Sequence, residues 1–392
     1  NLNDRDYYLQ KASVDEDVLS VAFSQSTHAS HMQAAGRVAR VLAEISPDNI
    51  STFNIVNINA GMAMYSMEVD RNSFSKNLPA NSFRVAARDI KIKPEKYEDR
   101  SYKYNPSKPF PVNFYKIEPT LRTQIGGPDG FFFGDLRLTY DGEILFDSNL
   151  SLSTSASIGI TDNLDNLKLA SDSILPHVRT DIVQYLKNSQ KYNIDRFQLN
   201  YFINPTPNIY GKMSVGLLET MFAGIGSEFL YRPFDKNYGI GAELWRVQQR
   251  DYDLMFGLRD YITTTGHINF YYIEPKSNIL FAVRGGRFLA RDSGLSFDFS
   301  RRFKSGFQLG VFFSRTDISK REFGEGSFDK GFYFHVPLDF FSTKYTKDVF
   351  TWGLKPLTRD GAAPLNHGFY LWGVTEQGQD ISHARNWDGI YD

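Results

Sequence analysis

Residues 295–303 read LSFDFSRRF, a run in which apolar and polar side chains alternate. The odd-numbered positions are Leu295, Phe297, Phe299 and Phe303, with Arg301 as the exception, and the even-numbered positions are Ser296, Asp298, Ser300 and Arg302. Successive side chains of a β-strand point to opposite faces, so this run predicts a strand with one apolar and one polar face. A soluble β-sandwich and a membrane β-barrel both contain such strands.

Similar segments recur from residue 114 onward. The candidate strands are roughly 114–125, 131–146, 150–160, 193–203, 209–219, 223–234, 238–250, 266–274, 279–290, 295–303, 306–316, 331–340, 348–355 and 368–376. Most have about the nine to eleven residues that a tilted strand needs to cross a bilayer. We therefore expect a mainly β protein in which residues 114–376 form an antiparallel transmembrane β-barrel of about 14 strands.

The predicted connections between these strands differ in length in a regular way. The long ones, at 161–192, 251–265, 317–330 and 356–367, all fall in one alternate set, while the other set contains only short ones. Membrane barrels have short turns at one end and long loops at the other. A soluble sandwich has no reason to sort its connections by parity, so the pattern favours the barrel.

Residues 1–95 predict a small α/β domain. Apolar residues at helical spacing indicate a helix over Ser30–Ile45, and short apolar runs indicate strands at 18–23, 53–58 and 61–69. If the barrel lies in an outer membrane, an even number of strands returns the C-terminus to the side of this domain, which we expect in the periplasm. Residues 96–113 are charged and interrupted by proline, which is typical of a connector, and residues 377–392 are expected to form a C-terminal tail.

The composition is aromatic-rich and nearly neutral. The 392 residues include 33 Phe, 22 Tyr and no Cys, with 44 basic against 45 acidic residues. This fits a membrane barrel with an apolar outer band and a polar interior, although an aromatic-rich soluble β protein has the same composition. The balanced charge gives no reason to expect a nucleic-acid partner. The absence of cysteine excludes a disulfide scaffold and a thiolate metal site.

The sequence contains no targeting or membrane-spanning helix. No run approaches about 18 consecutive apolar residues. The chain starts without Met and without a signal-like segment, so we expect a mature product or a piece of a longer protein.

Ionisable residues on the polar faces of the strands are the candidate functional residues. Following the alternation, the side chains expected to face the lumen are Glu228, Arg232, Glu243, His267, Arg284, Asp298, Arg302 and His335. Two interpretations stay open for this set. The groups neutralise one another and support the wall, or they form a mixed-charge, aromatic-lined surface that contacts a polysaccharide.

No catalytic, cofactor-binding or metal-binding motif is evident. Asp251 and Asp253 are close in sequence, but glycosidases hold two carboxyl groups across a cleft, which a pair in a predicted loop does not indicate. Gly-Gly at 285–286 and Gly-Xaa-Gly at 324–326 do not lie between a buried strand and a helix, so they are not phosphate loops. We therefore expect no enzymatic activity and no cofactor. The helix-like segment Ser173–Asn188 is expected either to fold inward as a plug or to cap the outer face.

Several long motifs resemble the YjbH/GfcD family. They are LPHVRTD (175–181), GLLETMFAGIGSEFLYRPF (216–234), AELWRVQQRDYDLMFGLRDY (242–261) with Thr265-Gly266-His267, GRFLARDSG (286–294), FGEGSFDKGFYFHVPLDFF (323–341) and PLTRDGAAPL (356–365). QAAGRVARVLAEISP (33–47) also resembles the α/β insert of that family. The resemblance implies an outer-membrane β-barrel linked to exopolysaccharide and group 4 capsule clusters of Gram-negative bacteria. Family members are nearly twice as long, so the resemblance implies that this chain corresponds to their C-terminal half. Its strands are then expected to close alone, to form one barrel of a tandem pair or to form part of a larger joint barrel.

These observations lead to one expected function and two alternatives. We expect a non-catalytic barrel that assists export or surface assembly of an exopolysaccharide or capsule. Its expected partners are outer-membrane lipids, a polysaccharide, a second barrel or N-terminal half, and polysaccharide-export proteins. The alternatives are a diffusion porin with an open lumen and a glycan-modifying enzyme that uses Asp251 and Asp253.

Overall fold

A computed structural model of the chain describes residues 7–77, 90–95, 102–104, 110–125, 129–168, 171–324, 326–341 and 346–391. The protein is mainly β, as predicted, and its strands form two sheets of 13 and five strands. Among the described residues, no helix combines the length and hydrophobicity needed to span a membrane.

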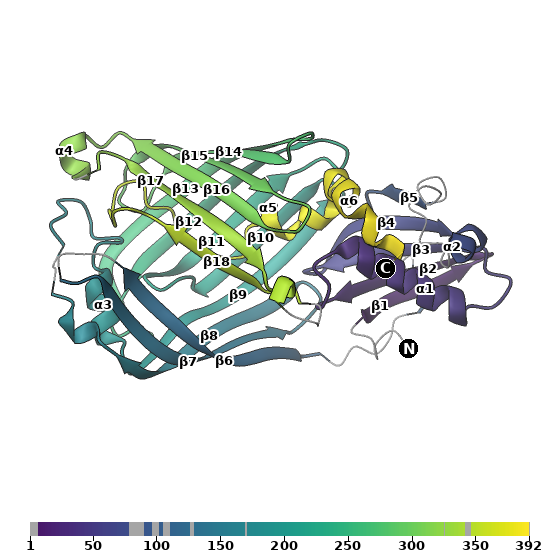
Figure 1. Cartoon of the computed structure of the whole chain (residues 1–392), viewed down its shortest axis with the longest axis horizontal. Coiled ribbons are helices and arrows are strands. Elements are labelled where there is room, and N and C mark those ends of the chain that lie inside the picture. The colour runs from purple at the N-terminus through teal and green to yellow at the C-terminus, as the bar shows by residue number, and fades with distance from the viewer. Residues whose placement is uncertain are drawn as a thin grey trace.

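The larger sheet is an antiparallel meander in which each strand pairs with its neighbours in sequence. Its strands are β6 (Val112–Ile125), β7 (Phe132–Leu145), β8 (Leu150–Asp162), β9 (Tyr192–Thr206), β10 (Ile209–Leu217), β11 (Phe222–Tyr231), β12 (Tyr238–Arg250), β13 (Leu258–Glu274), β14 (Ile279–Arg287), β15 (Ser293–Arg302), β16 (Gln308–Thr316), β17 (Asp329–Pro337) and β18 (Val349–Leu354). The sheet curls, so that its two edge strands, β6 and β18, both cross the front of the view in Figure 1.

The connections of the large sheet differ between its two ends. One end carries the long connections, with η5 (Leu164–Asn166) and α3 (Ile182–Asn188) after β8 and α4 (Lys320–Phe323) after β16 (Figure 1). The other end carries mostly tight turns, such as the β13–β14 turn, where Asn278 has a φ of 54°. Asparagine tolerates this left-handed conformation better than most residues. After β17, η6 (Leu338–Phe341) lies at this end, and Lys347 Nζ donates to Gln25 O of the smaller sheet at 2.8 Å.

The smaller sheet and its helices form an α/β unit at the tight-turn end (Figure 1). Its strands are β1 (Tyr7–Asp15), β2 (Val18–Gln25), β3 (Thr52–Asn59), β4 (Met62–Asp70) and β5 (Ile90–Lys93), and its helices are α1 (His31–Ile45) and α2 (Arg71–Asn77). Strands β2 and β3 are parallel because α1 connects them. Ser30 caps α1 by accepting from Gln33 N at 3.2 Å, and the buried residues of α1 pack on the sheet.

Residues 368–391 differ from the prediction. The expected strand 368–376 is wrong: this stretch contains α5 (Leu371–Val374) and the start of η7 (Glu376–Gly378). The large sheet therefore has 13 strands among the described residues rather than about 14. The physical reason is that Leu371 is fully buried and its N–H donates to the side chain of Glu228 instead of to a neighbouring strand.

The predicted C-terminal tail is folded as α6 (Asp380–Asn386) and η8 (Trp387–Tyr391), which pack on α1. At this contact Gly36 is required, because a Cβ there would overlap the carbonyl oxygen of Ile390. The chain thus returns to the α/β unit after completing the large sheet.

Candidate functional site

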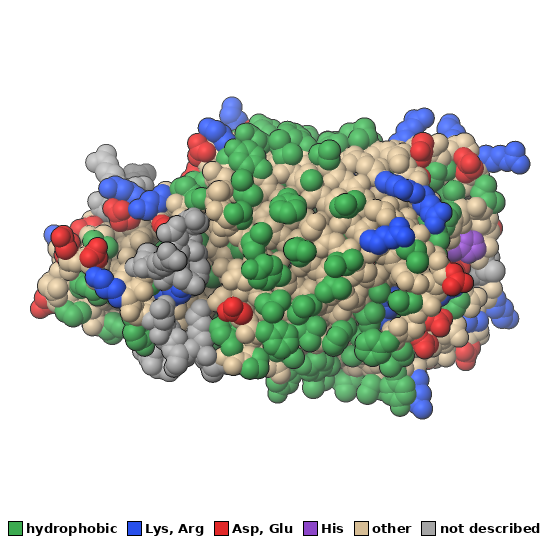
Figure 2. Space-filling model, turned by 180° about the vertical axis from the view of Figure 1, so that it is seen from behind, with side chains coloured by type: hydrophobic (Ala, Val, Ile, Leu, Met, Phe, Trp, Pro, Cys, Tyr) green, Lys and Arg blue, Asp and Glu red, His purple; other side chains and the backbone are tan. Residues whose placement is uncertain are grey.

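The large sheet has an apolar outer face and a polar inner face. Outward-pointing residues at the middle of its strands, including Ile225, Phe229, Ile240, Leu244, Ile268, Phe270, Leu295 and Val311, are 46–67% exposed. Their sequence neighbours point inward and are polar yet buried, among them Glu228, Glu243, His267 and Asn269. Figure 2 shows hydrophobic side chains spread over the outer face, with charged side chains mainly towards the two ends. This distribution is the reverse of that in a water-soluble protein.

Residues 355–375, which we call the interior strap, cross the space enclosed by the curled sheet. At the long-loop end, Asp360 accepts from Thr180 Oγ1 at 2.6 Å, and Leu289 N donates to Ala363 O at 3.0 Å. At the other end, Asn59 Nδ2 donates to Val374 O at 2.8 Å. The strap therefore connects the end of β18 to the α/β unit through the interior.

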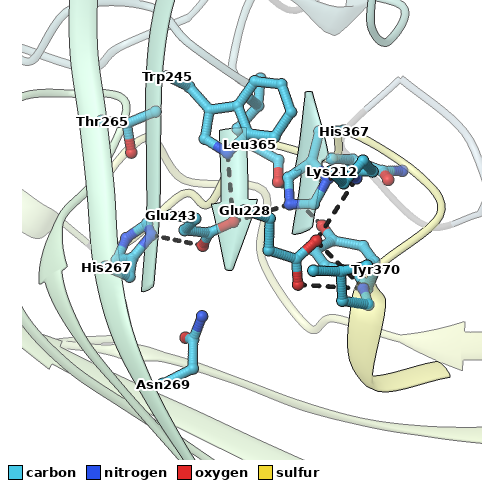
Figure 3. A network of polar contacts seen from close by, with 12 residues as sticks. Lys212, Glu228, Glu243, Trp245, Thr265, His267, Asn269, Leu365, His367 and Tyr370 are labelled. Carbon is cyan, nitrogen blue, oxygen red and sulfur yellow. Dashed lines mark hydrogen bonds and ion pairs between the residues drawn. The ribbon is translucent and has the colours of Figure 1, made fainter. Parts of the chain in front are cut away.

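Lys212 on β10 holds the middle of the strap. Its buried ammonium group lies 2.7 Å from His367 Nδ1 and donates to the carbonyl oxygens of Gly368 at 2.8 Å and Phe369 at 3.1 Å. Each of its three protons therefore has an acceptor on the strap. Glu228 lies 3.5 Å from Lys212 and also accepts from the N–H of Leu371 at 3.1 Å (Figure 3).

Glu243 on β12 holds the same segment from the other side. Its carboxylate lies 2.7 Å from His367 Nε2 and 2.9 Å from His267 Nδ1, and it accepts from Trp245 Nε1 at 3.3 Å (Figure 3). The His367 ring thus lies between the ammonium group of Lys212 and the carboxylate of Glu243. The Trp245 ring stacks on His367 at a centroid distance of 4.4 Å.

The buried polar cluster of Lys212, Glu228, Glu243, His267 and His367 holds the strap against the wall. Its charges oppose one another, and its hydrogen bonds connect the wall to the strap. Because a buried polar group without a partner costs about 1–3 kcal/mol, the cluster strongly favours the bound position of the strap. Among the described residues, no group of three or more His, Cys, Asp or Glu side chains is arranged to hold a metal ion.

The remaining predicted lumen residues are dispersed along the inner face. Arg232 donates to Trp372 O at 2.7 Å, and Arg284 lies 3.9 Å from Glu243. Asp298 accepts from the hydroxyl group of Tyr333, Arg302 pairs with Glu376, and His335 contacts Thr351. Of the predicted residues, Glu228, Glu243 and His267 thus lie in the buried polar cluster, and Arg284 lies beside it. Asp298, Arg302 and His335 lie away from this cluster.

Two central residues of the cluster were not among the candidates. Lys212 lies on the polar face of a predicted strand, opposite the apolar Ile209 and Met213. This alternation could have identified Lys212 as an inward-facing residue. His367 was assigned to a loop, where alternation carries no information. The segment 173–188 is helical only over α3, and it caps the long-loop end, where Arg179 pairs with Glu219 at 2.9 Å and contacts Pro364 O.

Asp251 and Asp253 lie in an exposed turn after β12. Asp251 accepts from Tyr252 N at 2.8 Å, and Asp253 accepts from Met255 N at 2.9 Å. Each carboxylate therefore stabilises its own turn.

The interior strap ends in a charged junction with the α/β unit. Burial opposes ionisation of Glu376, but Arg302 and Arg385 outweigh it and lower the pKa of this carboxyl group to about 2. Burial lowers the pKa of His383 to about 4, although a hydrogen bond to Gln377 O partly offsets the effect. Burial and the neighbouring His383 hold the pKa of His31 well below its usual range.

A cavity of about 710 Å³ lies between the strap and strands β6–β9. Its lining includes Asp141, Glu143, Ser155, Asp195, Arg196 and, from the strap, Phe369. A further cavity of about 290 Å³ shares Asp195, Glu219 and Thr220 with it and extends to Arg122 and Arg179. The strap therefore fills the interior beside β10–β13 and leaves a polar space beside β6–β9, which we call the side cavity.

Comparison with known proteins identifies the family. The model of the YjbH family, described as "Exopolysaccharide biosynthesis protein YbjH", matches residues 1–377. The chain belongs to this family. The "Uncharacterized lipoprotein YjbH" of Escherichia coli (strain K12) is a relative within it, 31% identical over 370 residues, which cover 92% of this chain and 52% of that protein. The chain thus spans about half the length of this curated relative, and the resemblance to the YjbH family in the sequence motifs is confirmed.

Proposed function

We propose that the chain is a non-catalytic outer-membrane β-barrel protein that assists export or surface assembly of an exopolysaccharide. The observation that carries this proposal is the reversed polarity of the large sheet. Along each strand of a membrane barrel, apolar residues that face lipid alternate with polar residues that face the lumen. The result is an apolar outer face around a polar interior. In this proposal β6 and β18 approach one another to complete the wall, alone or with another half of the protein.

The arrangement of the connections supports an orientation for the proposed barrel. Bacterial outer-membrane barrels have short turns on the periplasmic side and longer loops on the outside. The α/β unit lies at the tight-turn end, so we infer that it is periplasmic. There it would meet polysaccharide-export proteins or a second barrel. The relative's designation as a lipoprotein supports a location in the cell envelope, and the family description supports the role in exopolysaccharide production.

The interior strap favours an assembly or export factor over a diffusion porin. A porin needs a wide water-filled lumen, whereas here His367 and Leu371 of the strap are fully buried within the enclosed space. We therefore expect low conductance in planar bilayers. Stable open channels of porin size in the full chain would favour the porin instead.

Deletion of the gene and biochemical fractionation test the proposal directly. We expect the chain to partition with outer membranes, to show a gel mobility that changes on boiling, and to be needed for normal amounts of surface polysaccharide. Soluble behaviour without detergent would contradict the barrel, and unchanged polysaccharide in the deletion strain would contradict the role in export. The double substitution Asp251→Asn/Asp253→Asn is expected to leave polysaccharide yield and chain length unchanged, and a loss of either would favour an enzyme.

A further inference from the structure

The side cavity has the size and the lining of a ligand site. Its volume of about 710 Å³ lies within the range of about 300–1,000 Å³ that is common for small-molecule pockets. The lining combines hydroxyl groups of Ser153, Ser155 and Thr220 with the amide of Asn366 and the ring of Phe369. Hydroxyl, amide and carboxylate groups beside an aromatic ring match the hydrogen-bonding groups and apolar faces of sugars.

A β-bulge directs two successive charged side chains into this cavity. Ser155 of β8 pairs with Arg196, and the next residue, Ala156, pairs with Ile194, so Asp195 is the extra residue on β9. Regular alternation would point only one of Asp195 and Arg196 inward, but both line the side cavity. Bulges often re-aim side chains beside functional sites.

The charges of the side cavity are unbalanced towards negative. Among the residues that line it, five carboxylates, Asp141, Glu143, Asp195, Glu219 and Asp348, face two cations, Lys116 and Arg196. Glu219 is paired with Arg179 at 2.9 Å, which leaves four carboxylates against the two cations. Both cations already have contacts, since Lys116 pairs with Glu118 at 2.8 Å and the Arg196 guanidinium lies over the Phe369 ring at 5.7 Å. A water-filled space bounded by a surplus of carboxylates repels anions and concentrates cations.

We propose that the side cavity binds a segment of glycan that carries no acidic groups. Sugar hydroxyls donate to the carboxylates of Glu143 and Asp195, and one sugar ring packs on Phe369 of the strap. Uronic acids and other anionic sugars are excluded by the surplus of negative charge. This inference rests on the proposed function in polysaccharide export and names the class of polymer that the interior accepts.

A single engineered cysteine makes the cavity measurable, because the natural chain contains no Cys. Ser155 pairs with Asp141 on one side and with Arg196 on the other, so Ser155→Cys places a thiol in the wall of the cavity. Ser153→Cys, at the neighbouring inward position, replaces it if the first variant does not fold. The full chain in detergent or vesicles is treated with cationic, neutral and anionic methanethiosulfonate reagents of equal size, and the rates are corrected for their intrinsic reactivity.

We expect the cationic reagent to react at least about tenfold faster than the anionic one, because focused fields in clefts change local ion concentrations by about this factor or more. Glu143→Gln/Asp195→Asn in the same background should remove most of the difference. A control that removes two exposed carboxylates elsewhere, Asp235→Asn/Asp260→Asn, should preserve it. Equal rates, or a faster anionic reagent, would overturn the inference.

Binding is tested by protection of the same thiol. The probes are fragments of the exopolysaccharide secreted by the producing strain, obtained by partial hydrolysis and separated by anion exchange into neutral and acidic fractions. Neutral fragments at ten times their Kd should slow modification about tenfold, and acidic fragments should not. Equal protection by acidic fragments, or no protection by either fraction, overturns the inference. If the deletion strain meanwhile lacks surface polymer, the proposed function stands without this site; if the polymer is unchanged, the proposed function itself has failed.

Discussion

Ile268→Arg distinguishes a lipid-facing wall from a water-facing one. Ile268 is 67% exposed, while its neighbours His267 and Asn269 are buried on the inner face. The outward positions of β13 run from Leu258 to Glu274, so Ile268 lies near the middle of the apolar band. Its partners on the adjacent strands, Ala242 and Gly285, are too small to cover a guanidinium group.

The two environments predict different magnitudes for this change. An arginine that faces lipid at the bilayer midplane costs about 2–4 kcal/mol of folding free energy in a membrane barrel. On a surface in water, the replacement of an exposed side chain away from any specific contact changes stability by about 0.5 kcal/mol or less. Ile174, 73% exposed in the segment after η5, provides the matched control Ile174→Arg.

The free energy of unfolding is measured by urea titration of the full chain in lipid vesicles, with tryptophan fluorescence and the boiled-versus-unboiled gel shift as independent signals. Ile268→Arg should lower it by about 2–4 kcal/mol, and Ile174→Arg should stay within about 0.5 kcal/mol of the parent. If the two variants have the same stability in vesicles, the outer face does not contact lipid and the membrane proposal is wrong.

Three further predictions concern strand β15, the interior strap and the junction of the strap with the α/β unit. Phe297→Arg should destabilise the protein by about 2–4 kcal/mol in vesicles if it lies near the midplane, whereas Ser296→Arg, on the inner face, should change the same urea midpoint little; equal effects would indicate two buried faces. Lys212→Met leaves the carboxylate of Glu228 buried without its cation and should lower the free energy of unfolding by about 3–5 kcal/mol. A urea titration that compares this variant with the exposed control Lys236→Met checks the prediction. Because the pKa of His383 is lower in the folded state, about 4, than in the unfolded state, about 6.5, the unfolded chain binds the proton first. The contribution of His383 to stability is therefore complete above about pH 6.5 and falls by about 3 kcal/mol as the pH approaches 4; thermal unfolding of His383→Gln, which keeps a donor for Gln377 O, should lack this part of the pH dependence and retain the part due to His31, and an identical pH profile would contradict it.

Much of the large sheet was predictable because its strands have one apolar and one polar face. LSFDFSRRF overlaps β15, and the inward and outward sides follow the alternation: Ser300 is buried and Leu295 is 47% exposed. The short edge strands of the small sheet were harder. β5 has only four residues, with no periodicity long enough to recognise, and β1 carries its buried positions irregularly around a register shift near Leu9 and Lys11.

The strap was missed for a physical reason. Residues 369–373 read FYLWG, and their large apolar and aromatic side chains are typical of a strand. Inside the curled sheet, however, both sides of the segment are enclosed, so its sequence reflects contacts in all directions rather than two faces. Lys212 and Glu243, the residues that hold the strap in place, are distant from it in sequence. Local sequence patterns do not contain information about contacts between distant residues.

The path of the strap has a consequence for the order in which the protein is made. Asn59 of the α/β unit bonds to Val374, 315 residues later, and Lys347 bonds to Gln25, 322 residues earlier. The α/β unit therefore lacks part of its own packing until residues 347 and 374 are synthesised. Contacts of such long sequence separation slow folding and prolong the exposure of apolar surface. Maturation of this chain is thus expected to depend on holding chaperones until the interior strap has docked on the α/β unit.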